Sequence, residues 1–246
     1  MPIAWFETPV GRDLLQAEAD ACRAQLGSVF GSFGAVFSIG GVGEPVLRDL
    51  EFSARHVFAV DGSASGVREP VCAVPDQLPI ASETLRLVVV QHALEAIQNP
   101  AAFLAECERV LAAGGTLAVL GLNPRGRSLR WRREPPPWVR RWWTCQEVRE
   151  EVVRSAFRFD GARPVLAHRN WWERVGLGWE DSRAGAPLGL LSSGYLAVFT
   201  KPRNGARVIP LGKSSRRRIA GVTGTVGSLS VRGGGPEVEE QRRVAR

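Results

Sequence analysis

The sequence has few of the residues that build metal centres and disulfide frameworks. Its four cysteines (Cys22, Cys72, Cys107 and Cys145) occur in no CxxC or CxC spacing, and its three histidines are equally scattered. A disulfide-stapled secreted domain and a structural zinc site both need such residues in clusters, so we expect neither, and no metal ligands. We interpret the isolated cysteines as small buried apolar residues in a reducing compartment.

Long apolar runs are also missing. No stretch approaches the ~18 consecutive apolar residues that a membrane-spanning helix requires. The first residues, MPIAWFET, have neither a basic start nor an apolar core, so no signal peptide is expected. These absences predict a cytoplasmic protein without a membrane span.

Lysine is nearly absent, since only two of the 32 basic residues are lysines, which indicates a compositional bias toward arginine. The net charge of +7 lies entirely in the stretch from Arg203 to Arg246, which has ten basic and three acidic residues. Residues 1–202 are neutral, with 22 residues of each sign. The basic stretch predicts at most a weak, salt-sensitive contact with nucleic acid. It is rich in Gly, Ser and Arg and buries too little apolar surface to offset an ordering cost of ~1–2 kcal/mol per residue, so we expect a disordered tail over 203–246.

Between residues 9 and 121 the apolar pattern alternates between helical and extended periods. Helices are expected over 9–30, over 44–52, and from Pro100 to a stop at Gly114 and Gly115. Strands are expected over 35–39, 57–60, 71–74, 85–90 and 116–121. Because these strands are almost wholly apolar, both of their faces should be covered. The pattern predicts an α/β protein, a three-layer α/β/α sandwich with a mostly parallel, Rossmann-like sheet.

The second half is less regular. Residues 125–145 are rich in Arg, Trp and Pro, and we interpret them as an insertion whose tryptophans pack on the body while the arginines stay solvated. A helix is expected over 147–157 and strands over 164–167 and 195–200. The predicted organisation is a helical extension over 1–34, a main domain over 35–202 that contains this insertion, and the basic tail.

Three stretches together form a recognisable pattern. Residues 78–95 read LPIASETLRLVVVQHALE, residues 109–117 read RVLAAGGTL, and residues 121–124 read GLNP. They resemble class I S-adenosylmethionine-dependent methyltransferases of the type 11 small-molecule branch, within a proteobacterial group of methyltransferase-like proteins. The resemblance covers about residues 33–201. It implies a methyltransferase sheet, S-adenosyl-L-methionine as cofactor and a small-molecule methyl acceptor; the catalytic residues and the oligomeric state stay unassigned.

The resemblance also implies a set of cofactor contacts. In the family a glycine-rich turn after the first strand brings backbone close to the cofactor, where a Cβ would block the approach. An acid after the second strand accepts hydrogen bonds from both ribose hydroxyls. The end of the strand at 85–90 is where ligands bind in open α/β sheets. The residues expected to bind the cofactor are Gly40, Gly41, Gly43, Asp61, Gln91 and His92.

Several positions depart from the family pattern, and these departures leave alternative functions open. Ser38 stands where the family has an acid, Val74 replaces an acid near the adenine, and Arg86 replaces the acid at the start of a strand. The main alternative is therefore a non-catalytic binding or scaffold protein with a degenerate cofactor site. In that case the glycines form an ordinary strand-to-helix turn, and His92 is a hydrogen-bonded structural histidine. A nucleotide-binding oxidoreductase is a further alternative, but the glycine spacing does not supply its GxGxxG turn.

Overall fold

The computed structural model describes residues 2–60, 71–125, 136–165 and 192–203. All the described residues belong to one compact unit, Met1–Ala206. Asp61 and nearly all of the predicted tail lie outside the described residues. Ribose binding by Asp61, disorder of the tail and its contact with nucleic acid therefore stay predictions.

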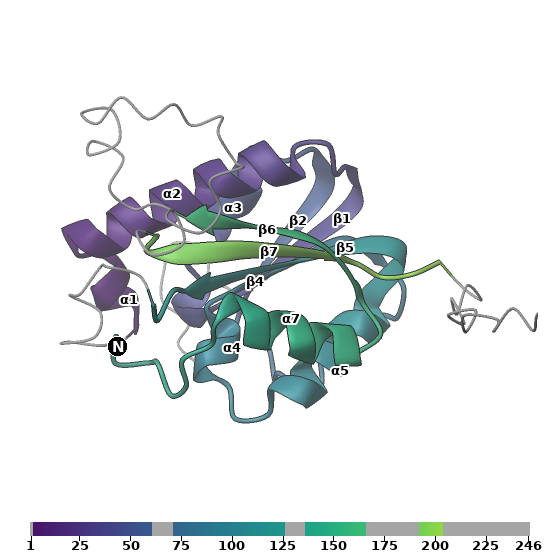
Figure 1. Cartoon of the computed structure of the whole chain (residues 1–246). Coiled ribbons are helices and arrows are strands. Elements are labelled where there is room, and N and C mark those ends of the chain that lie inside the picture. The colour runs from purple at the N-terminus through teal and green to yellow at the C-terminus, as the bar shows by residue number, and fades with distance from the viewer. Residues whose placement is uncertain (1, 61–70, 126–135, 166–191, 204–246) are drawn as a thin grey trace, which may run out of the picture. The chain divides into compact units, whose positions relative to one another are not determined.

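Seven strands form one sheet in the order β3-β2-β1-β4-β5-β7-β6 (Figure 1). They are β1 (Gly31–Ser38), β2 (Phe52–Ala59), β3 (Val71–Cys72), β4 (Leu85–Gln91), β5 (Leu111–Leu122), β6 (Arg158–Val165) and β7 (Gly194–Thr200). The first five in spatial order are parallel, and β7 is antiparallel to both β5 and β6. The mostly parallel sheet is thus confirmed. The carboxyl ends of β1, β2 and β4 meet at one edge, which we call the carboxyl edge.

Helices cover both faces of this sheet (Figure 1). They are α1 (Pro2–Phe6), α2 (Pro9–Leu26), α3 (Glu44–Arg48), α4 (Ala93–Ala96), α5 (Pro100–Val110) and α7 (Cys145–Arg154). Helices α2 and α3 lie on one side, and α4, α5 and α7 lie on the other. The predicted three-layer arrangement is confirmed. No helix among the described segments is long and apolar enough to cross a membrane.

Helix α2 begins and packs as its sequence indicates. The Thr8 side chain accepts a hydrogen bond from the Gly11 amide at 3.1 Å, and a proline occupies the first turn. Leu14, Glu18 and Cys22 recur every four residues, so they share one face, and all three are buried against the core. An acidic residue therefore sits in the middle of an apolar stripe.

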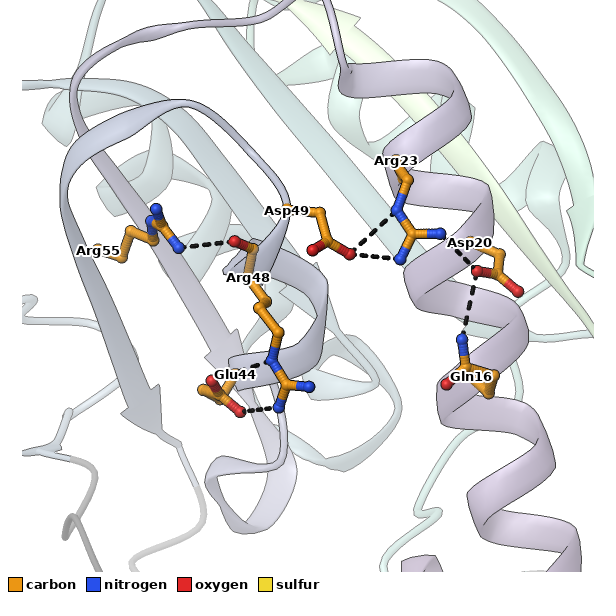
Figure 2. Close-up of polar contacts among 7 residues, drawn as sticks. All are labelled: Gln16, Asp20, Arg23, Glu44, Arg48, Asp49 and Arg55. Carbon is orange, nitrogen blue, oxygen red and sulfur yellow. Dashed lines mark hydrogen bonds and ion pairs between the residues drawn. The ribbon is translucent and has the colours of Figure 1, made fainter.

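Four predicted helix ends are wrong. Helix α2 ends at Leu26 rather than at residue 30, and α7 ends at Arg154 rather than at residue 157. Helices α3 and α5 also end early, each beside a contact between distant elements. Helix α3 ends at Arg48 rather than near residue 52, where Arg55 of β2 donates a hydrogen bond to the Arg48 carbonyl at 2.7 Å (Figure 2). Arg23 of α2 pairs with Asp49 at the same place, as Figure 2 shows. Side-chain donors at a helix end satisfy carbonyl groups that have no partner within the helix.

Helix α5 stops at Val110 and not at Gly114. The Lys201 ammonium donates hydrogen bonds to the carbonyls of Glu108 and Leu111, at 2.7 and 2.9 Å. These bonds cap the last turn, and β5 begins at once. Helix α1 was not predicted. Strand β6 begins at Arg158 and not at residue 164, because its polar residues lie on an outer strand and give little apolar signal.

Candidate functional site at the carboxyl edge

The glycine turn after β1 needs glycine for two different reasons. Gly40 and Gly41 have φ angles of 66° and 69°, a left-handed conformation that other residues rarely adopt. Gly43 has an ordinary φ of −78°, but a Cβ there would lie 1.9 Å from Cγ1 of Val36. The first two glycines shape the turn, and the third lets it lie directly on β1.

Gln91 ends β4 beside the end of β1. It is the register partner of Ser38, and both residues are fully buried. A Cβ on Gly43 would lie 3.2 Å from Gln91 Oε1, so the amide also reaches the glycine turn. Its Nε2 donates a hydrogen bond of 2.7 Å to Glu18 Oε2. The structure thus brings together the turn, the end of β4 and the acid of α2.

His92 follows Gln91 in a left-handed conformation with a φ of 56°. Its Nε2 lies 2.8 Å from Glu18 Oε1, and its Nδ1 lies 3.4 Å from Glu95 Oε2. Burial lowers the pKa of the imidazole, but the negative charges of Glu18 and Glu95 outweigh burial and raise that pKa to about 10. His92 is therefore a buried imidazolium at neutral pH, held between two acids. In this state it has no free nitrogen to act as a base.

Two aromatic rings cover His92, one from helix α1 and one from the insertion. The Phe6 ring stacks on the imidazole with centroids 5.8 Å apart, and the Trp138 ring lies 5.3 Å from it. Helix α1 lies so close to α2 that a Cβ on Gly11 would be 2.4 Å from the Trp5 carbonyl oxygen. Trp138 and Trp143 are 7% and 3% exposed, so the interpretation that tryptophans of the insertion pack on the body is confirmed for these two.

Glu18 was missed in the sequence. The signal that could have found it is an acid in the apolar stripe of α2, because a charge in such a stripe needs a buried partner. Ser38 Oγ and Gln91 Oε1, at the ends of β1 and β4, are among the buried polar atoms that have no hydrogen-bond partner within the described part of the chain. No group of His, Cys, Asp or Glu suited to a metal ion occurs among the described residues.

Two hollows in the structure lie away from this cluster. A cavity of about 650 Å³ opens beside the end of α3 and the start of β2, lined by residues that include Phe30, Arg48 and Arg55. A second, of about 560 Å³, lies between α7 and Phe159 of β6. Neither is lined by a residue of the predicted cofactor set.

The fold of the chain agrees with that of known structures. The chain aligns with a putative methyltransferase of Haloferax volcanii, solved with the Trm112 methyltransferase activator, at a TM-score of 0.59 and 18% identity. That alignment covers 82% of this chain and 96% of the other. Geranyl diphosphate C-methyltransferase of Streptomyces coelicolor aligns at a TM-score of 0.52 and 13% identity over 76% and 77% of the two chains. The chain has a class I methyltransferase fold.

Sequence comparison points the same way. Residues 37–119, which contain the glycine turn and the end of β4, match the sequence model of a methyltransferase domain. Uncharacterised proteins of Mycobacterium tuberculosis and Mycobacterium bovis are 28% identical to this chain over 180 residues. The match covers 66% of this chain and 59% of the mycobacterial proteins, so the chain spans well under two thirds of their length. The relatives extend beyond the proteobacterial group that was expected.

Proposed function

We propose that this chain is an S-adenosylmethionine-dependent methyltransferase that acts on a small-molecule acceptor. The observation that carries the proposal is the left-handed turn at Gly40 and Gly41, which lies within the matched methyltransferase domain and beside the end of β4. Such a turn allows a ligand to approach the backbone without meeting a Cβ. Gly43 supports the turn through packing, and Asp61 is the proposed partner of the ribose hydroxyls.

The polar groups at this edge fit the cofactor. A buried polar group without a partner costs about 1–3 kcal/mol, and Ser38 Oγ and Gln91 Oε1 are two such groups side by side. A polar ligand would complete their hydrogen bonds. The bound cofactor would supply a methyl group on a sulfonium, which the lone pair of the acceptor attacks as the carbon–sulfur electron pair leaves to sulfur.

The chain's own contribution to this reaction is mainly to position and desolvate the reactants. The protonated His92 cannot take the acceptor's proton, and the carboxylates of Glu18 and Glu95 are buried against the imidazole, so the proton would pass to solvent. Methyl transfer of this kind does not require a built-in acid–base pair.

The test is calorimetric titration of the full chain with S-adenosylmethionine and S-adenosylhomocysteine. We expect micromolar binding of both ligands and at least a tenfold weaker affinity in the Asp61→Ala variant, which removes both proposed ribose bonds. Release of S-adenosylhomocysteine in the presence of an acceptor panel then tests catalysis. Absence of binding at millimolar ligand would refute the proposal.

A non-catalytic binding protein is the second candidate, favoured by the burial at this edge. Ser38, Gln91 and His92 are all fully buried, His92 beneath Phe6 and Trp138, so a ligand reaches them only if the cover moves. The same titration separates the two candidates, because a protein that has lost its cofactor site binds neither ligand.

A further inference from the structure

The cluster around His92 contains more negative than positive charge. Glu18 and Glu95 both face the imidazole, and neither carboxylate forms an ion pair with an arginine or lysine among the residues that the structure describes. With both carboxylates ionised, even a fully protonated His92 leaves this group with one excess negative charge. All three side chains are buried, and an uncompensated buried charge is costly. A further cation would neutralise the cluster.

Two hydrogen-bond acceptors, on Ser38 and Gln91, lie at the neighbouring ends of β1 and β4, and Gln91 contacts Glu18. Ser38 and Gln91 are register partners on adjacent parallel strands, so their side chains extend from the same face of the sheet. Gln91 donates its Nε2 to Glu18, which leaves its Oε1 without a partner and near Gly43. Ser38 Oγ has no partner either. A carboxylate offers about four lone-pair sites, and Glu18 accepts one hydrogen bond, from Gln91, while its other oxygen forms an ion pair with His92.

We propose that Glu18, Ser38 and Gln91 bind a primary ammonium group, that of the amino-acid end of S-adenosylmethionine. An alkylammonium has three donors and no acceptor, which matches these three acceptors, and its charge neutralises the cluster. The assignment rests on the proposed function. It gives helix α2, which lies outside the matched domain of residues 37–119, a direct part in cofactor recognition.

The experiment compares a ligand that has the amino-acid end with one that lacks it. S-adenosylhomocysteine carries the ammonium and the carboxylate of that end, whereas 5′-methylthioadenosine has the same adenosine and sulfur with a methyl group in its place. In the full-length Glu18→Gln variant we expect S-adenosylhomocysteine to bind on the order of tenfold to a hundredfold more weakly, the usual effect of losing a charge-assisted hydrogen bond. The affinity for 5′-methylthioadenosine should stay within about twofold of wild type.

Two further variants separate binding from folding. Asp20→Asn removes an acid from the exposed side of the same helix, where Asp20 pairs with Arg23, and should bind S-adenosylhomocysteine as wild type does. Ser38→Ala removes a buried hydroxyl that has no partner, so the free protein should be as stable as wild type or more so. Its affinity for S-adenosylhomocysteine should nevertheless fall by about threefold to tenfold. This variant tests the proposal even if Glu18→Gln does not fold.

The outcomes distinguish this assignment from the proposed function. If wild type binds none of the ligands, the proposed function fails and the assignment fails with it. If wild type binds them and Glu18→Gln leaves the affinity for S-adenosylhomocysteine unchanged, only the assignment is overturned, and an amine on the acceptor becomes the source of the cation. An equal loss of both ligands in Glu18→Gln would also overturn it, because that pattern indicates a structural role.

Discussion

Raising the pH from 6.5 to 8 should weaken the folded protein through His92. The folded state keeps a proton on His92 up to about pH 10, whereas the unfolded chain releases it near pH 6.5. The stabilisation is therefore complete below pH 6.5 and is lost as the pH rises through 10. A pKa difference of this size corresponds to about 5 kcal/mol in total, of which about 2 kcal/mol disappears between pH 6.5 and 8.

Urea denaturation followed by tryptophan fluorescence at several pH values measures this loss. The comparison is limited to pH 6.5–8, because burial also raises the pKa of the Cys22 and Cys107 thiols. Above pH 8 these thiols would add a further loss of unfolding free energy. Glu18→Gln removes an acid that faces the ring, so the pH dependence should become shallower. An imidazole that nuclear magnetic resonance finds neutral at pH 8, or a stability that is constant from pH 6.5 to 8, would refute the reasoning.

Three other substitutions test individual contacts in the fold, one in the packing of the glycine turn and two at helix ends. Gly43→Ala places a Cβ against the buried Val36 and should cost about 1–3 kcal/mol in urea denaturation, whereas Gly161→Ala, with nothing within 4 Å, should be close to neutral. Lys201→Met removes the two hydrogen bonds at the end of α5 and should lower the unfolding free energy by about 1–3 kcal/mol; an unchanged midpoint contradicts the capping role. Thr144→Ala removes the cap of α7 and should cost about 1 kcal/mol, and Thr144→Ser should restore most of it.

Local signals in the sequence predict much of the sheet and the helices. The three valines of β4 and the proline at the start of α5 act within a few residues, so this strand and the beginning of this helix appear where they are expected. The glycine turn is equally local, because a left-handed conformation depends on the residue that adopts it. Predictions failed at α3 and α5, whose ends depend on Arg55 and Lys201 from distant strands.

The residues of the candidate site likewise include some that local sequence predicts and some that depend on contacts between distant elements. The alternation of strands and helices predicts that Gly40, Gly41 and Gln91 lie near the ends of two buried strands, since it implies a shared carboxyl edge. The contact of Glu18 with Gln91, 73 residues further along the chain, and the charge of His92 depend instead on tertiary packing. Both facts follow from how α2 packs across the sheet, because the charge of a buried group depends on its neighbours in space and not on those in sequence.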